Sequence, residues 1–280
     1  MKKGLVLEGG AMRGIYTAGV LDVFLEHGIE FDGVAGVSAG AVHGCSYVSK
    51  QKGRSIRYYK KYCKDKRFMS WYSFFTTGNI VGTKFCYDDL PNRLDVFDND
   101  AFEKSNVNYY VGATNCETGE GELILCDTLR GEDIHYIRAS ASMPFVSEIV
   151  EINDKKYLDG GIGDSIPVKR MMKEGYDKNV VVLTREEGYR KKPELPLLAK
   201  LVYKKYPKLV ESILNRHNMY NETIDEIHRL EKENKIVVIR PSKNLNISRM
   251  EHDKEKIEQQ YELGRTDALA KLEEIKLYIK

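Results

Sequence analysis

Ser38 lies between two glycines, Gly36 and Gly40, in a run that reads GVSAG. In a GxSxG turn the small residues let the backbone fold so tightly that the serine side chain projects from the end of a strand. Apolar residues at 34–37 predict that strand, and residues 39–48 predict a helix that begins directly after the serine. Such a helix would direct free N–H groups and its positive dipole end at an anion beside Ser38. Both features suit an acyl-transfer nucleophile, although a plain tight turn would have the same composition.

A second glycine-rich turn follows the apolar run 4–7, which predicts another strand. The turn consists of Gly9, Gly10, Ala11, Met12, Arg13 and Gly14. Consecutive backbone N–H groups in a turn of this kind can converge on an oxyanion. A Walker phosphate loop requires Lys and then Ser or Thr after its last glycine, but Ile15 and Tyr16 stand there. The dinucleotide fingerprint GxGxxG also fails, because Ala11 occupies the position of its middle glycine.

A serine hydroxyl needs a base to accept its proton. Asp159 ends a short predicted strand at 156–158 and precedes Gly160 and Gly161, although an Asp-Gly pair alone more often marks a turn. The six histidines are His27, His43, His135, His217, His228 and His252. None of them follows a predicted strand in a loop, which is the usual setting of a catalytic histidine. A Ser-His-Asp esterase stays open as an alternative, but a nucleophile as early as Ser38 is unlike that class.

Strand, glycine turn and helix occur twice within the first fifty residues. This alternation predicts an α/β fold with a largely parallel sheet. Further strands are predicted at 109–114, 122–126, 146–152, 180–183 and 236–239. Apolar residues at helical spacing predict long amphipathic helices at 208–235 and 254–280.

The composition narrows the class of protein. A chain of 280 residues can form one large core, and its net charge of +2 gives no overall field that would attract nucleic acid. Five cysteines without metal-ligand spacing favour a reducing cytoplasm and predict neither disulfides nor structural zinc. No window approaches the roughly 18 to 20 apolar residues of a membrane span. Any lipid contact is therefore expected to be peripheral.

Together the turns EGGAMRG, GVSAG and LDGG resemble those of the patatin-like phospholipase family in order and context. The resemblance covers at least residues 4–170, because RASASMPFV at 138–146 and Ile166-Pro167 also fit. Segments at 217–224, 235–242 and 261–268 resemble a bacterial subgroup. The resemblance implies a three-layer sandwich with a largely parallel central sheet flanked by helices. Residues 1–175 would form the catalytic core, and residues 176–280 a C-terminal continuation whose late strands and long helices pack on it.

The resemblance also implies roles for individual residues. Ser38 matches the nucleophile and Asp159 the base that takes its proton directly. Gly9, Gly10 and Ala11 match the oxyanion hole, and the residues that complete the motifs are Arg13, Gly14, Gly36, Gly40, Gly160 and Gly161. The family's usual third glycine is Ala11 here, which would distort the hole if that backbone needs a positive φ.

The implied activity is hydrolysis of phospholipid or related acyl-lipid esters, with no cofactor and no metal. The alternative is a catalytically quiet lipid-binding or regulatory protein of the same fold. Residues 50–67 carry nine Lys or Arg and one acid, and an aromatic run at 68–75 follows. Lys50–Phe75 is therefore expected to contact an anionic membrane at its inner, cytoplasmic face. A solvated helix face followed by a core-filling loop is the alternative for this segment.

Overall fold

The computed structural model describes residues 1–193 and 196–280, and eight strands of these residues form one sheet. Its order is β5-β6-β3-β2-β1-β7-β8, with β4 paired to β3 beside this path. The strands are β1 (Lys2–Leu7), β2 (Gly33–Val37), β3 (Asn108–Asn115), β4 (Gly121–Leu125), β5 (Val150–Ile152), β6 (Lys155–Asp159), β7 (Tyr176–Val182) and β8 (Ile236–Ile239). Strands β3, β2, β1, β7 and β8 run parallel, whereas β4, β5 and β6 pair antiparallel.

The register of the sheet aligns the ends of several strands. Leu7 at the end of β1 pairs with Gly36 of β2 and with Val182 of β7. The segments that follow β1, β2 and β7 therefore leave the sheet at the same edge. Strand β6 runs antiparallel to β3 and brings Asp159, its last residue, opposite Ala113 near that edge.

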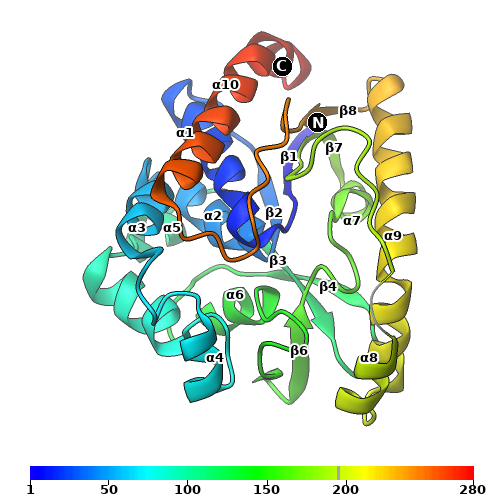
Figure 1. Cartoon of the computed structure of the whole chain (residues 1–280). Coiled ribbons are helices and arrows are strands. Elements are labelled where there is room, and N and C mark those ends of the chain that lie inside the picture. Colours follow the sequence, from blue (N-terminus) through cyan, green and yellow to red (C-terminus); the bar gives the residue numbers. More distant parts are fainter. Residues whose placement is uncertain (194–195) are drawn as a thin grey trace.

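Helices cover both faces of the sheet and complete three layers (Figure 1). They are α1 (Ile15–Glu26), α2 (Ala39–Val48), α3 (Arg54–Tyr62), α4 (Trp71–Thr77), α5 (Asn99–Glu103), α6 (Ile134–Ser140), α7 (Val168–Lys173), α8 (Pro196–Val202), α9 (Pro207–Lys232) and α10 (Lys254–Tyr278), with a 3₁₀ turn η1 (Ala11–Gly14) and a π-helical segment η2 (Phe85–Leu94). Alternating residues of β1 show the two cores: Leu5 and Leu7 pack with α1, α2 and α10, and Val6 packs with α7 and α9. Strands β7 and β8 lie beyond residue 175 yet extend the same sheet.

Two segments differ from the sequence-based expectation. Only Val150–Ile152 of the predicted strand 146–152 is a strand, because the preceding residues turn at Pro144 and at Phe145, whose φ is 71°. The aromatic run at 68–75 is not a plain loop, since α4 begins within it at Trp71. The Ser70 side chain caps α4 by accepting a hydrogen bond from the Ser73 N–H at 3.0 Å.

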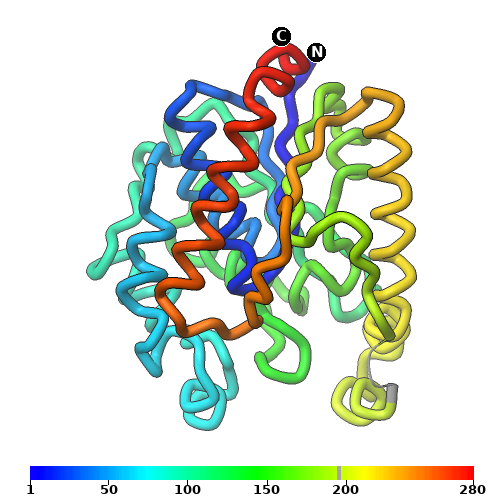
Figure 2. Tube along the Cα trace, turned by 45° about the horizontal axis from the view of Figure 1, so that its top comes forward, coloured from blue at the N-terminus to red at the C-terminus, as the bar shows by residue number. Residues whose placement is uncertain are grey.

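The two ends of the molecule differ. Figures 1 and 2 place both chain termini at one end and the short helices α4 and α8 at the other. Across the residues that the structure describes, no helix combines the length and apolar character that crossing a membrane requires.

Candidate active site

Ser38 occupies the sharp turn that the GVSAG motif predicts. Its φ of 53° and ψ of −122° lie outside the regions that L-residues usually adopt. The flanking glycines permit this turn: a Cβ on Gly36 would lie 2.6 Å from the Ala41 backbone, and a Cβ on Gly40 would lie 2.4 Å from the Leu7 carbonyl oxygen. A side chain at either position would therefore force the strand and helix apart.

The segment at the end of α6 holds both halves of the site. The Ser38 N–H donates to Ser140 Oγ at 2.7 Å, and the Ser140 hydroxyl donates to the Gly112 carbonyl oxygen at 2.5 Å. Nearby, the Asp159 N–H donates to the Ser142 carbonyl oxygen at 2.9 Å. This segment therefore fixes the serine turn of β2 and the last residue of β6 relative to each other.

Asp159 is buried, and the Ser38 side chain lies close enough to favour the charged form of its carboxylate. The Gly161 N–H also donates to Asp159 Oδ1, at 2.7 Å. Burial raises the pKa of Asp159 above its ordinary value, because the charged form loses solvation, and the nearby Arg216 charge opposes this rise. A carboxylate with a raised pKa is a better proton acceptor than an ordinary aspartate.

The glycine-rich turn after β1 lies against the serine. A Cβ added to Gly9 would lie 3.0 Å from Ser38 Cβ. Within the described part of the chain, the backbone N–H groups of Gly9, Gly10 and Ala11 donate to no protein acceptor. Unengaged donors beside a serine hydroxyl are the arrangement that an oxyanion hole requires.

Ala11 has a φ of 49°, so the backbone at this position does adopt the left-handed conformation that favours glycine. A residue with a Cβ is destabilised by about 1–2 kcal/mol in the left-handed region. Glycine avoids this strain, but its greater conformational entropy in the unfolded chain lowers the stability of the folded state by about 0.4–1 kcal/mol. We therefore expect Ala11→Gly to raise the free energy of unfolding by about 0.5 kcal/mol in denaturant titrations. Ala18→Gly, a buried change inside α1, should instead lower it by about 1 kcal/mol or more. Equal losses in the two variants would mean that Ala11 is not strained.

Two cavities meet at Ser38. The first, here called the apolar cavity, has walls that include Val42, Tyr58, Phe68, Leu90 and Ile137. The second, here called the cationic cavity, has a volume of about 350 Å³ and basic side chains from Arg13, Arg185, Lys191, Arg216 and Arg249. Ala11, Ser38 and Met143 line both. An ester held at Ser38 would therefore have an apolar space on one side and a charged space on the other.

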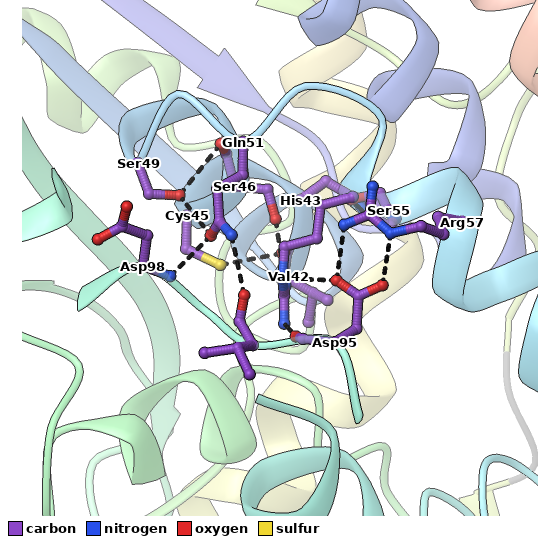
Figure 3. Close-up of polar contacts among 12 residues, drawn as sticks. Val42, His43, Cys45, Ser46, Ser49, Gln51, Ser55, Arg57, Asp95 and Asp98 are labelled. Atoms are coloured by element: carbon purple, nitrogen blue, oxygen red, sulfur yellow. Dashed lines mark hydrogen bonds and ion pairs between the residues drawn. The ribbon is translucent and has the colours of Figure 1, made fainter. Parts of the chain in front are cut away.

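A polar cluster lies beside the part of the apolar cavity that Arg54 lines (Figure 3). Arg57 donates to both carboxylate oxygens of Asp95, at 2.7 and 2.8 Å. His43 Nδ1 lies 2.9 Å from Ser55 Oγ in the same cluster. Burial lowers the pKa of His43 to about 3, with the Arg54 charge as the second cause. His43 is therefore a neutral core residue on α2, where its Nδ1 pairs with Ser55.

The remaining histidines also lie away from the serine. None of the six histidines lines either cavity among the residues that the structure describes. His228 contacts Glu187, and His252 Nδ1 lies 2.5 Å from the Cys63 carbonyl oxygen. The Asp159 carboxylate, by contrast, lies close enough to Ser38 for the serine side chain to lower its pKa.

Sequence reasoning assigned no role to several residues that organise the site. Glu8 accepts hydrogen bonds from the Thr184 N–H and hydroxyl and from the Tyr220 hydroxyl, at 2.5, 3.0 and 2.8 Å. This buried carboxylate ties the ends of β1 and β7 to α9. Ser140 and Tyr220 both lie in segments that carry the family resemblance, 138–146 and 217–224, so the motifs contained a signal for them.

The mostly parallel sheet between two helical layers, with a serine turn at the carboxyl ends of its strands, defines a three-layer α/β protein. Within this class, the chain belongs to the patatin-like phospholipase family, whose model matches residues 5–172. A second model, for a domain of unknown function (DUF6363), matches residues 206–280.

Individual proteins are similar to part of the chain. The chain is 32% identical over 190 residues to "Uncharacterized protein YjjU" of Escherichia coli, covering 64% of this chain and 51% of that protein. It is 29% identical over 179 residues to "Lysophospholipase NTE1" of Meyerozyma guilliermondii, covering 61% of this chain and 12% of that protein. Among solved structures, VipD from Legionella pneumophila is similar with a TM-score of 0.41 and 13% identity, over 95% of this chain and 67% of that one.

Proposed function

We propose that the protein is a serine acyl hydrolase that cleaves phospholipid or related acyl-lipid esters through a Ser38–Asp159 dyad. The observation that carries this proposal is the closeness of Ser38, which lines both cavities, to the buried carboxylate of Asp159 in one of them. Membership of the patatin-like phospholipase family and the similarity to a lysophospholipase support lipid esters as the substrate class.

In the proposed reaction, the Asp159 carboxylate takes the proton of the Ser38 hydroxyl as the serine oxygen attacks the acyl carbonyl. The N–H groups of Gly9, Gly10 and Ala11 stabilise the negative charge that develops on the carbonyl oxygen. The ester C–O bond then breaks, and the leaving alcohol receives the proton from Asp159. Water hydrolyses the acyl-enzyme by the same steps, releasing the fatty acid and restoring the serine.

The glycines that complete the motifs act through geometry in this proposal. Gly14, like Gly36 and Gly40, allows close packing, because a Cβ there would lie 2.5 Å from Ala39 Cβ at the start of α2. A Cβ on Gly160 would lie 2.2 Å from the Gly112 carbonyl oxygen. These contacts keep the two turns and Asp159 close together.

The test is release of fatty acid from a panel of diacyl and monoacyl glycerophospholipids and acylglycerols in mixed micelles, followed by mass spectrometry. Release of fatty acid from at least one lipid class supports the proposal. If lipids bind but none is cleaved in micelles or in vesicles, the protein would instead be a lipid-binding member of the family.

We further propose that the end of the molecule with α4 and α8 contacts a lipid surface. Large apolar side chains on both helices are exposed: Trp71, Tyr72, Phe75, Leu197, Leu198, Leu201 and Val202. Exposed lysines accompany them, including Lys66 before α4 and Lys204 after α8. Apolar residues with neighbouring cations suit an anionic membrane. Phe68 and Met69 by contrast are buried, so only part of the segment 50–75 is available for this contact.

This membrane contact fits the position of the cavities. Trp71 of α4 lines the cationic cavity. Phe145 lines the same cavity, and its N–H donates a hydrogen bond at 2.8 Å to the hydroxyl of Tyr203, which follows α8. The five cysteines are free thiols, which suits a reducing compartment and hence the cytoplasmic face of a membrane.

We expect the double variant Phe75→Ser/Leu201→Ser to bind anionic vesicles at least about tenfold more weakly, because each change removes a large apolar side chain from the contact. Co-sedimentation with vesicles of phosphatidylglycerol and phosphatidylcholine at low salt measures this. Leu277→Ser is the matched control, because Leu277 is 69% exposed near the C-terminus, at the opposite end of the molecule. Equal loss in the control and the double variant would argue against a contact at α4 and α8.

A further inference from the structure

Among the described residues that line the cationic cavity, positive side chains outnumber negative ones. The carboxylates among these residues are Glu8 and Asp159, and Glu8 is already engaged by Thr184 and Tyr220. The cations among them are Arg13, Arg185, Lys191, Arg216 and Arg249. We infer that this cavity binds the phosphate of a lipid head group with a net negative charge, so that the enzyme prefers anionic lipids. This inference rests on the proposed function, since it names the substrate class of the same site.

Three of the arginines, Arg13, Arg185 and Arg249, lie close together. Arg13, Arg185 and Arg249 form no ion pair among the described residues, and Arg13 Nε is buried with no hydrogen-bond acceptor. Burial, and after it the neighbouring charge of Arg185, lowers the pKa of Arg13 to about 10. Like charges held together in this way repel one another until an anion neutralises them. A phosphate group would therefore be stabilised at this position.

The chemistry of the side chains fits a phosphate. The planar guanidinium group donates two parallel hydrogen bonds to phosphate oxygens and keeps its charge at all relevant pH values. The aromatic rings of Tyr189 and Tyr220 lie 4.2 Å from the cations of Arg185 and Lys191, respectively, which restricts both cations to the wall of the cavity. A choline or ethanolamine group would bring an additional positive charge into the same space. A zwitterionic lipid is therefore expected to bind less well than an anionic one.

The arrangement of the two cavities indicates how such a lipid would bind. With its acyl chain in the apolar cavity and its ester carbonyl at Ser38, the glycerol phosphate would enter the cationic cavity, because the two spaces meet at that serine. Arg185 follows β7, Arg216 lies on α9 and Arg249 precedes α10. These three residues lie outside the part of the chain that matches the family model. Most of the cations that would set the head-group preference therefore lie outside that part of the chain.

The experiment compares three substrates with one identical acyl chain: lysophosphatidylglycerol, lysophosphatidylcholine and monoacylglycerol. We expect kcat/KM for lysophosphatidylglycerol to exceed that for lysophosphatidylcholine by about tenfold or more, because a like charge in the cavity is unfavourable. Arg185→Gln and Arg249→Gln should each reduce this ratio by roughly fivefold. Lys243→Gln is the matched control, because Lys243 is an exposed cation in the same loop as Arg249 but does not line the cavity. The control should keep the ratio of the wild type.

Three outcomes overturn the inference: equal rates for the anionic and zwitterionic lipids, an unchanged ratio in both arginine variants, or an equal change in the control. A soluble phosphate ester is the other source of the same chemistry. If glycerol 3-phosphate raises the melting temperature of Ser38→Ala and lysophosphatidylglycerol does not, the cavity binds a soluble ester and the head-group assignment is wrong. Labelling of the wild type by a fluorophosphonate reports the nucleophile independently of any head group. A labelled enzyme without head-group preference therefore refutes only the inference, whereas an unlabelled and inactive enzyme refutes the proposed function.

Discussion

Replacing Ser38 with alanine is expected to lower kcat/KM for lipid-ester hydrolysis by roughly four orders of magnitude or more. Loss of the nucleophile removes the acyl-enzyme route altogether, and only weak catalysis by the remaining hydrogen-bond donors persists. The side chain is small and the turn depends on the Ser38 N–H, which alanine retains. The variant should therefore fold as the wild type does, with a similar circular dichroism spectrum and melting temperature.

Ser49→Ala provides the matched control for this loss. Ser49 is a buried serine at the end of α2, and its hydroxyl has two acceptors within reach of its one proton, the Ser46 carbonyl oxygen at 3.2 Å and Gln51 Oε1 at 3.1 Å. Its removal should cost about 1 kcal/mol of stability, as a typical hydrogen bond does, and leave the rate constant unchanged. A Ser38→Ala enzyme that keeps more than a few per cent of the activity would exclude Ser38 as the nucleophile.

Replacing Asp159 with asparagine is expected to lower kcat/KM by roughly three to four orders of magnitude, because an amide cannot accept the proton of the Ser38 hydroxyl. Steady-state rates measured beside the wild type check this.

In the wild type, the need for an ionised Asp159 predicts that activity falls on the acidic side of the pH–rate profile. Burial raises the pKa of Asp159, so activity should fall, as the pH is lowered, at a higher pH than an ordinary aspartate would give.

Stability distinguishes this loss of activity from a loss of structure. Because the folded-state pKa of Asp159 is raised, the folded protein holds its proton more tightly than the unfolded chain does. The wild type therefore loses stability as the pH rises from the unfolded pKa through the raised folded pKa, where the buried group becomes charged. Asp159→Asn lacks this loss and should be the more stable protein near neutral pH, with the difference shrinking in acid. An Asp159→Asn enzyme that is inactive and also less stable at neutral pH would not support a catalytic base.

Much of the geometry of the candidate site could be predicted because it is encoded locally. The GVSAG turn requires small residues at fixed spacing, and the helix that starts after Ser38 has the bounds 39–48 that periodicity predicts. Strand β8 likewise has the bounds 236–239 of its apolar run. Asp159 was harder to predict, because an Asp-Gly pair alone more often marks a turn. Its role as the base was inferred only from the order of the three turns along the chain.

The rest depends on contacts between distant parts of the chain. The arginines of the cationic cavity stand at positions from 13 to 249, and no local pattern indicates that they meet. The strand predicted at 146–152 was too long because tertiary contacts hold its first residues in an irregular segment: the Val146 carbonyl oxygen accepts from the Ile80 N–H at 2.8 Å. The aromatic run at 68–75 divides between core and surface, which its composition could not reveal.

The most direct measurement is labelling of the purified protein with a fluorescent fluorophosphonate, with wild type, Ser38→Ala and Asp159→Asn compared on one gel. If Ser38 is an activated nucleophile that transfers its proton to Asp159, the wild type labels, Ser38→Ala does not, and Asp159→Asn labels far more slowly. A wild type that stays unlabelled in buffer, in detergent and with anionic vesicles would contradict the dyad. Labelling of Ser38→Ala as fast as the wild type would contradict it equally, because another residue would then be the nucleophile.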